Sequence, residues 1–239
     1  WVAHCERYAS DMTDRFGLDA ESQVVEVASN DGTLLRLFHE RGMRCTGIEP
    51  TASTASAARG LGLDIVEEFL TRVSAERMAS EGLAADLLSA NNVVAHVPDV
   101  DDFVAACGRL LAPSGVATFE FPHLTRMVAE GQFDTIYHEH FSYLSLKVMD
   151  RIATAAGLMV FDVERLPTHG GSLRVYLQRT DAGVRPIEES VEATLAIEVE
   201  AGIDHPAFYS GFQERADRIK DDLLRFLLDT RGEGRMVVG

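Results

Sequence analysis

The chain has 239 residues, 46% of them hydrophobic, and a formal net charge of −16 at pH 7. This length and composition allow a sizeable buried core, as one large domain or two small ones. The charge argues against a nucleic-acid partner because no basic patch of the needed density is available, although local donors can still bind a small anion.

Cysteine usage and hydropathy restrict the compartment. Cys5, Cys45 and Cys107 are scattered, odd in number and never form a Cys-x-x-Cys pair. This favours a reducing compartment and argues against a disulfide framework or a cysteine zinc site. No apolar run reaches the roughly eighteen residues of a membrane span, and no charged-then-apolar leader begins the chain. We therefore expect a soluble, cytoplasmic protein with no membrane partner.

The two ends of the sequence suggest a piece of a longer protein. The chain begins with Trp1 rather than Met, and it stops at residues 236–239, Met-Val-Val-Gly, where a strand pattern is just starting. A strand that ends as it begins has no partner of its own. We therefore expect the chain to be a fragment.

Apolar periodicity predicts that helices and strands alternate along the first half of the chain. Helices are expected over residues 1–17, 33–38, 53–59 and 100–111. Short strands are expected over residues 23–28, 45–50, 63–66, 86–90 and 116–121, the last after a Pro-Ser-Gly turn at 113–115. This alternation is typical of a parallel sheet with helices on both faces.

The second half departs from that alternation. Residues 158–163 and 173–178 read as two strands joined through a Gly-rich turn, and the second alternates apolar and polar residues as an outer antiparallel strand does. Residues 187–229 are acidic and helical, with an interruption at 202–206. The order predicts an α/β fold with a doubly wound, mostly parallel, Rossmann-like sheet of the class I methyltransferase type. A late antiparallel hairpin belongs to a domain over residues 1–182, and a helical extension follows over 183–239.

The turn after the first strand is the first candidate binding feature, and it contains Glu26, Ala28, Ser29, Asn30 and Gly32. At the C-terminal edge of a strand, a tight turn lets backbone N–H groups approach a ligand, and the following helix start favours negative charge. The turn lacks the G-x-G-x-x-G pattern of a pyrophosphate cradle, which argues against a nicotinamide ligand. An ordinary strand-to-helix turn is the alternative.

An acidic residue at the end of the second strand strengthens the binding hypothesis. Glu49 lies seventeen positions after Gly32 and directly before Pro50. A carboxylate at this point accepts hydrogen bonds from both ribose hydroxyls of a nucleoside ligand. Because the first turn has no diphosphate loop, the pair favours S-adenosyl-L-methionine over a dinucleotide. The alternative is a solvated carboxylate at a strand end.

Polar residues also follow the fourth strand, where Asn91 and Asn92 are joined by His96 in the same loop. Ligands of open α/β sheets bind beyond the C-terminal ends of the strands, so these three residues are candidates for ligand contact. The two amides could instead cap the next turn.

A cluster of ionisable residues, His138, Glu139 and His140, directly follows Tyr137. Adjacent side chains rarely converge on one ion, and the spacing is not the i, i+4 of a helical zinc motif, which argues against a metal site. Acid–base chemistry fits better, because a histidine can take a proton, a nearby carboxylate can orient it, and Tyr137 can donate to a developing oxyanion. A polar loop whose histidines bond to local backbone is the alternative.

These segments together resemble the S-adenosyl-L-methionine-dependent sugar C-methyltransferases, which act on nucleotide-linked keto-deoxysugars in the biosynthesis of branched antibiotic sugars. The resemblance runs over the whole chain, and its most specific part is the segment around Tyr137. The segments that carry it are EVASNDGTLL, GIEP, NNVVAHVPD, FEFPHL, QFDTIYHEHFSYLS and THGGSLRVY.

The resemblance implies a role for each candidate. His140 matches the general base that removes a proton from the sugar carbon beside a C-4 ketone, and Tyr137 and Glu139 match groups that bind the sugar and stabilise the enolate. The resemblance implies no metal in this part of the protein. Implied substrate contacts are Asn92, His96 and His169 of the THGG segment, and implied cofactor contacts are Glu26, Ala28, Ser29, Asn30, Gly32, Glu49, Pro50 and Asn91.

The sequence departs from the family at both ends. Full-length members carry an N-terminal zinc-binding domain rich in cysteine, which three isolated cysteines cannot supply, and a further C-terminal α/β domain. The oligomeric state cannot be read from the sequence. Two other functions stay open: an O- or N-methyltransferase of a small molecule, and a non-catalytic domain that binds S-adenosyl-L-methionine or a nucleotide.

Overall fold

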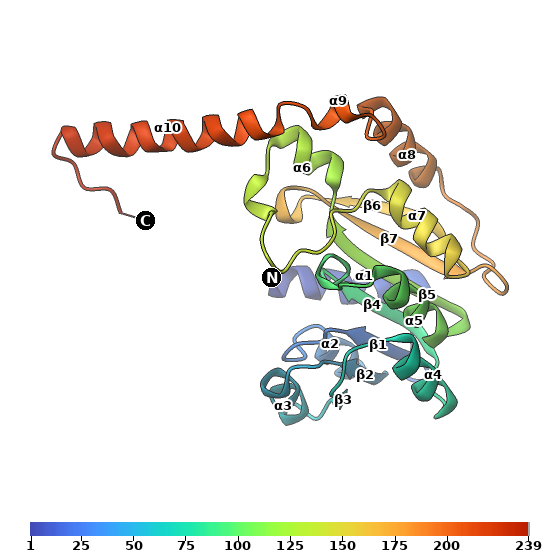
Figure 1. Cartoon of the computed structure of the whole chain (residues 1–239). Coiled ribbons are helices and arrows are strands. Elements are labelled where there is room, and N and C mark those ends of the chain that lie inside the picture. The colour runs from blue at the N-terminus through green and yellow to red at the C-terminus, as the bar shows by residue number, and fades with distance from the viewer. Residues whose placement is uncertain (239) are drawn as a thin grey trace.

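A seven-stranded sheet forms the centre of the molecule in the computed structural model, which describes residues 1–238 (Figure 1). The strand order is β3-β2-β1-β4-β5-β7-β6, in which β7 runs antiparallel to both neighbours and the strands from β3 to β5 are parallel. The predicted mostly parallel sheet and its late antiparallel hairpin are therefore confirmed. The strands are β1 (Gln23–Val27), β2 (Arg44–Ile48), β3 (Asp64–Val66), β4 (Ala85–Asn91), β5 (Leu111–Pro122), β6 (Leu158–Leu166) and β7 (Ser172–Arg179).

Helices cover both faces of this sheet. Buried side chains such as Tyr8 and Ala58 pack α1, α2 and α3 against one face, and Met78, Phe103 and Met149 pack α4, α5 and α7 against the other. The α-helices are α1 (Val2–Phe16), α2 (Leu35–His39), α3 (Ala52–Gly60), α4 (Arg72–Ser80), α5 (Val100–Leu110), α6 (Leu124–Glu130), α7 (Leu146–Ala155), α8 (Glu189–Ala201), α9 (Pro206–Tyr209) and α10 (Phe212–Gly232). Three short 3-10 turns are η1 (Val94–His96), η2 (Phe133–Thr135) and η3 (Thr168–Gly170).

Three helices, α4, α6 and α7, are not anticipated by the periodicity of the sequence. α4 begins at a capping box formed by Thr71 and Ser74, and Ser145 caps the first turn of α7 by accepting from the Val148 N–H. Caps of this kind satisfy backbone donors that a helix start otherwise leaves free. In α4, however, Met78 is the only long apolar side chain that is buried, so the helical face is weak in the sequence.

The predicted turn before the fifth strand lies inside β5 as a bulge. Ala85 of β4 pairs with Leu111, and Leu87 then pairs with Val116, so the residues between Leu111 and Val116 are accommodated as extra length. Gly115 is required here, because an added Cβ would lie 2.3 Å from the Ala85 carbonyl oxygen. The strand therefore begins earlier than predicted, at Leu111.

The expectation that the second hairpin strand is an outer strand is wrong. β7 lies between β5 and β6, and its residues from Ser172 to Gln178 are all buried. The alternating polar residues face α1 rather than water: Arg174 lies over the ring of Tyr8 in α1 and bonds to Glu120 of β5. Alternation in this strand reflects a buried polar layer, which sequence alone does not distinguish from a solvated face.

The acidic C-terminal segment forms α8, α9 and α10, and α10 projects well beyond the sheet (Figure 1). α8 is held by Glu198, whose buried carboxylate accepts from the ring of His123 and from the N–H groups of Leu146 and Lys147 at the start of α7. Residues 235–238 have no regular structure, so the strand expected from residue 236 is not formed there, and Gly239 lies outside the described residues.

Candidate active site

The turn between β1 and α2 has an unusual backbone. Ala28 and Asn30 adopt φ values of 54° and 51°, in the left-handed region that non-glycine residues seldom occupy, and Gly32 follows with φ 79°. An added Cβ on Gly32 would lie 2.3 Å from the Leu63 side chain. The glycine is therefore needed where the turn packs against the segment leading into β3, and the turn is shaped by neighbouring elements.

The expectation that this turn offers backbone N–H groups to a ligand is not met at most of its positions. The amides of Ala28 and Ser29 donate to the Ile48 carbonyl, and that of Asn30 donates to Glu49. Gly32 donates to the Ser29 carbonyl, and Thr33 donates to the Asp31 side chain. These donors are already satisfied, so contacts to a ligand fall mainly to side chains and carbonyl groups of the turn.

Glu49 is the residue that ties the turn to the end of β2. Its side chain is buried, with 3% of the residue exposed, and accepts from the N–H groups of Asn30 (3.0 Å) and Thr51 (2.8 Å) and the hydroxyl of Thr54 (3.1 Å). The Thr54 hydroxyl lies 2.9 Å from the Thr51 carbonyl as well. The Thr54 hydroxyl can therefore donate to the Thr51 carbonyl instead of to Glu49. The Glu49 carboxylate, which has about four acceptor sites in total, would then be free to accept from a hydroxyl group of a ligand.

Several buried polar atoms near the ends of β1 and β4 have no partner among residues 1–238. They are Oε2 of Glu26, Oγ of Ser29, Oγ of Ser89 and Oδ1 of Asn91. Glu26 and Ser89 are register partners on adjacent strands. Buried polar atoms are normally hydrogen-bonded, so this group fits a polar ligand that lies across the ends of β1, β2 and β4. A nucleoside linked to an amino acid, as in S-adenosyl-L-methionine, has the donors that these oxygens lack.

Burial also changes the acid strength of Glu26. Loss of hydration raises the pKa of this carboxyl to about 8, the N–H of Leu35 opposes the change, and the negative charges of Asp31 and Glu49 add to it. At neutral pH the carboxyl is therefore largely protonated, and it can both donate and accept hydrogen bonds.

A cavity of about 320 Å³ lies beyond the ends of β4 and β5. It brings together five of the predicted residues, Asn92, His96, Tyr137, His140 and His169, although they come from three separate segments of the chain. The segment after η2 reaches this place because the Phe141 N–H donates to the Ala95 carbonyl in the loop after β4 (2.8 Å). Other lining residues are Ala95, Pro122, Gln132, Asp134, Thr135 and Gly170.

His140 is held in one orientation and one tautomer by its neighbours. Its Nδ1–H donates to the Thr135 carbonyl at 2.8 Å, because a carbonyl oxygen can only accept. In the neutral ring Nε2 is therefore the unprotonated nitrogen, and it accepts from the Tyr137 hydroxyl at 2.9 Å. The expected orienting carboxylate is replaced by a backbone carbonyl. The arrangement presents a basic nitrogen and a phenolic donor side by side at the cavity.

A second imidazole borders the first. The rings of His96 and His140 meet edge to face with 4.6 Å between their centroids. Burial, with the neighbouring His140 as a second cause, lowers the pKa of His96, and Glu139 opposes this shift. His96 is therefore kept neutral over a wider pH range than a free histidine, which favours hydrogen bonding over charge.

Strained backbone borders the same cavity. Asn92, directly after β4, has φ 58°, and His169, in the turn between β6 and β7, has φ 52°. The Gln132 side chain donates to the Gly170 carbonyl at 2.8 Å and joins that turn to the loop before His140. Such conformations persist only where their surroundings fix them, and they concentrate at binding sites.

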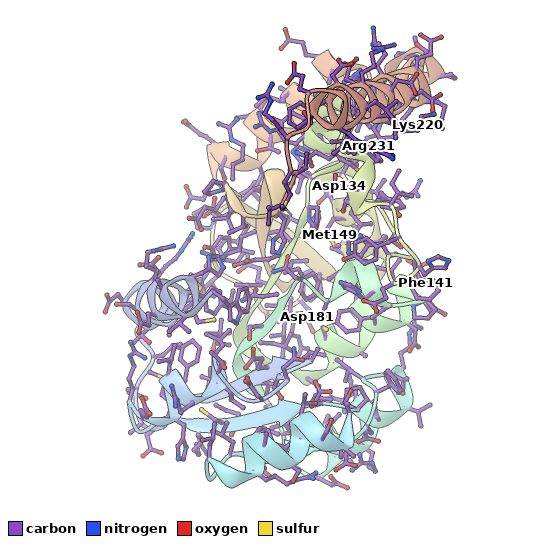
Figure 2. The ribbon with its side chains drawn as sticks, turned by 90° about the vertical axis from the view of Figure 1, so that its left-hand side faces the viewer. Asp134, Phe141, Met149, Asp181, Lys220 and Arg231 are labelled. Carbon is purple, nitrogen blue, oxygen red and sulfur yellow. The ribbon has the colours of Figure 1, made fainter. Side chains whose placement is uncertain are left out.

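Two members of the sequence cluster stand apart from the cavity. His138 and Glu139 are exposed and do not line it, although they are adjacent to His140. Phe141 is also exposed, at the edge of the molecule (Figure 2). Sequence reasoning missed Gln132, Asp134 and Thr135. The pattern QFDTIYHEH places them near the cluster, but nothing in it shows which side chains and carbonyl groups turn inward.

Two kinds of feature are absent from the described part of the chain. Between residues 1 and 238, no group of three or more His, Cys, Asp or Glu side chains is arranged to hold a metal ion. In the same part of the chain, no helix has both the length and the apolar character needed to cross a membrane.

Known protein families match both parts of the chain. Residues 1–163 match the methyltransferase domain family, and residues 167–239 match the C-methyltransferase C-terminal domain family. The C-methyltransferase NovU of Streptomyces niveus is 32% identical over 240 residues, which cover 100% of this chain and 56% of that protein. The chain thus spans little more than half the length of this relative.

More distant proteins share the first part or the fold. A ubiquinone biosynthesis O-methyltransferase of Rhizobium leguminosarum bv. trifolii is 24% identical over 179 residues, or 66% of this chain and 67% of that protein. Magnesium protoporphyrin IX methyltransferase of Synechocystis PCC 6803, solved with bound SAH, superposes with a TM-score of 0.58 at 12% identity, over 74% of this chain and 83% of that one. The last likeness is one of fold.

A methyltransferase domain agrees with the observed α/β sheet order, and its need for a bound ligand agrees with the unpartnered polar atoms at the ends of β1 and β4. The methyltransferase domain family covers more than half of the chain, and the C-methyltransferase C-terminal domain family follows it. Over residues 1–163 the chain therefore belongs to the methyltransferase domain family, and its residues 167–239 match the C-methyltransferase C-terminal domain family.

Proposed function

We propose that the protein methylates a carbon of a nucleotide-linked 4-keto-deoxysugar, next to the ketone. The observation that carries this proposal is the geometry of His140, whose basic Nε2 lies 2.9 Å from the Tyr137 hydroxyl at a cavity near the ends of β4 and β5. Removal of a proton beside a ketone needs a base and a donor to the ketone oxygen, and this pair supplies both. The relative NovU, named a C-methyltransferase, supports carbon as the acceptor.

His140 and Tyr137 divide the chemistry between them. Nε2 takes the proton from the sugar carbon, and the electron pair of that C–H bond moves into an enolate. The resulting imidazolium is stabilised because Nδ1–H already donates to the Thr135 carbonyl. The Tyr137 hydroxyl, released from Nε2, donates to the enolate oxygen. S-adenosyl-L-methionine, when bound, supplies an electrophilic methyl group on a sulfonium.

Cofactor binding is proposed for the residues at the ends of β1, β2 and β4. Glu49 would exchange the Thr54 hydroxyl for ribose hydroxyls, and Glu26, Ser29 and Asn91 would use their unpartnered oxygens. The remaining contacts would come from the backbone carbonyl groups of Ala28, Asn30 and Gly32 and from Pro50, which lies between β2 and α3.

Substrate binding is proposed for Asn92, His96 and His169, which line the cavity with the two catalytic residues. A cavity of about 320 Å³ suits one sugar ring and is too small for an attached nucleotide. Glu139 would have to turn inward to reach a sugar, since its side chain is exposed. We therefore keep His140 and Tyr137 as the catalytic pair.

The proposal extends to the whole protein. Residues 1–182 would form the methyltransferase unit, and residues 183–239 would lead into a further domain that helps bind the nucleotide. Zinc would be confined to an N-terminal domain of the full-length enzyme, which would act in the cytoplasm on an antibiotic sugar.

The test locates the transferred methyl group. The full-length protein is incubated with methyl-labelled S-adenosyl-L-methionine and a nucleotide-linked 4-keto-deoxysugar, and the product is analysed by NMR. A methyl group on the carbon beside the ketone is expected. A methyl ether or a methylamine would instead support an O- or N-methyltransferase, and binding of the cofactor without turnover on any keto-sugar would support a binding module.

A further inference from the structure

A second cavity, of about 620 Å³, adjoins the first at Gly170. It is lined by residues of α6, of α8 and of the turn between β6 and β7. Gly170 lines both cavities, so the two cavities lie next to each other at this residue. A further cavity, which His140 also lines, has a volume of about 10 Å³ and cannot hold a ligand group.

Positive charge distinguishes the second cavity from the first. Arg126 and Arg165 line it, whereas the active-site cavity has no Arg or Lys in its lining and contains Asp134. Arg126 pairs with Glu130, which also lines the cavity. Arg165 makes no ion pair within residues 1–238 and is exposed beside it. Arg165 thus brings positive charge to this cavity in a chain whose net charge is −16.

A buried hydroxyl in the same lining lacks a partner. Oγ1 of Thr125, a residue with 7% of its surface exposed, has no hydrogen-bond partner within residues 1–238. A threonine hydroxyl can donate to an anionic oxygen, and a buried one without a partner is normally satisfied by a ligand or by water. Thr125 adjoins Arg126 in α6, so a donor and a cation come from the same turn of helix.

We propose that this second cavity, defined by Thr125, Arg126 and Arg165, binds the diphosphate of the nucleotide-linked substrate. The inference rests on the proposed function, since it names where the charged part of that substrate lies when the sugar fills the first cavity. Guanidinium groups recognise phosphate oxygens through two parallel hydrogen bonds, and the cavity has room for a diphosphate outside the sugar site. The anomeric oxygen, which joins the sugar to the diphosphate, would thus lie beside Gly170.

The test measures anion binding without methyl transfer. Inorganic pyrophosphate and uridine diphosphate are titrated calorimetrically into the full-length protein, into Arg165→Gln and into Arg126→Gln. Loss of one charge-assisted contact is expected to weaken both ligands by roughly tenfold or more. The matched control is Arg72→Gln, an exposed arginine of α4 that also pairs with one carboxylate, Asp102, and it should bind both ligands as the wild type does.

Two results would overturn the inference: no binding of either ligand to the wild type up to about 5 mM, or dissociation constants in both cavity variants equal to those of Arg72→Gln. S-adenosylhomocysteine should bind all variants alike, which checks that each is folded. A failure of the proposed function would give a different result. Carbon methylation would then be absent, while the wild type would still bind pyrophosphate and Arg165→Gln would still bind it more weakly. If methylation occurs but Arg165→Gln leaves the Michaelis constant of the nucleotide-sugar unchanged, the subsite is refuted.

Discussion

The two ends of the proposed active site, a cofactor end and a substrate end, are built in different ways. At the cofactor end, the turn after β1 and the loop after β2 have satisfied their own backbone donors, and Glu49 is almost fully buried. At the substrate end, loops from β4, β5, η2 and η3 surround an open cavity, and 45% of Tyr137 is exposed. The first end is a preformed support near the sheet, whereas the second depends on a few contacts between loops. Substitutions at the substrate end should therefore lower methyl transfer, whereas substitutions at the cofactor end should lower the affinity for the cofactor.

The largest expected effect is at the substrate end. His140→Gln removes the basic nitrogen, and we expect methyl transfer to fall by roughly 10²–10⁴-fold, the contribution typical of a positioned base. Affinity for S-adenosylhomocysteine should stay within about twofold, because the cofactor end does not contact His140. Rates come from product formation and affinities from calorimetry. Equal losses in both would contradict the separation of the two ends.

The next effect belongs to the cofactor end. Glu49→Gln replaces a carboxylate that accepts from the Asn30 and Thr51 N–H groups, and the new amide group would face one of those donors. We expect S-adenosylhomocysteine to bind roughly 10- to 100-fold more weakly, as expected for a lost charged acceptor. Glu67→Gln, at an exposed carboxylate that pairs with Arg59, is the control. If Glu49→Gln binds S-adenosylhomocysteine as tightly as the wild type does, the proposed contact between Glu49 and the ribose is contradicted.

A smaller effect is expected from Tyr137→Phe, which removes the hydroxyl that donates to Nε2 of His140. The turnover number should fall about tenfold, because one hydrogen bond to the developing enolate oxygen is lost. The Michaelis constant should change little. Steady-state kinetics against the nucleotide-sugar separate the two parameters, and a rise in the Michaelis constant alone would make Tyr137 a binding residue only.

The pH dependence of stability tests the buried cofactor end. Glu26 has its pKa raised to about 8 by burial, so between the unfolded value and 8 the native state holds a proton that the unfolded state has lost. The contribution of this carboxyl to the free energy of unfolding is therefore complete below the unfolded pKa, and it is lost as the pH rises from that value to about 8. Glu26→Gln should flatten this fall and raise the melting temperature at pH 8.5 by at least about 3 °C, with little change at pH 5. Calorimetry in the absence of ligand measures the melting temperature at each pH.

The control is the exposed residue Glu21, and Glu21→Gln should keep the wild-type dependence of stability on pH. If Glu26→Gln also keeps it, the result would argue against a neutral buried carboxyl.

The smallest effect is expected at Glu139, which is adjacent to the base but exposed. Glu139→Gln should keep its turnover number within about threefold of wild type, as for a surface substitution. A loss comparable with that of His140→Gln would show that the loop closes inward when substrate binds. This variant therefore sharpens the boundary of the substrate end.

The fold was predictable because its strands and helices are marked locally. Short apolar runs such as Gln23–Val27 and the glycine-punctuated turns fix the alternation that a parallel sheet requires. β7 was misjudged as an outer strand, since burial of Arg174 and Tyr176 beneath α1 depends on contacts with distant residues. Periodicity reports which residues share a face, and it does not report what covers that face.

The grouping of the candidate residues at one cavity was more predictable than the contacts that they make. His140 and Tyr137 were marked as acid–base candidates by residue type and by resemblance, and the structure brings them to one cavity with His96. The orienting group could not be foreseen, because a carbonyl such as that of Thr135 is present in every residue. Glu139 shows the converse, since neighbours in a loop can point to opposite sides.

The central claim is that Nε2 of His140 removes a proton from the carbon beside a ketone. The most direct measurement is exchange of that proton with deuterated solvent, followed by NMR, with S-adenosylhomocysteine in place of the methyl donor. The account predicts exchange in the wild-type full-length protein, loss of it in His140→Gln, and retention in the exposed neighbour His138→Gln. Exchange that survives in His140→Gln, or none in a wild-type enzyme that still transfers methyl groups to an oxygen, would contradict it.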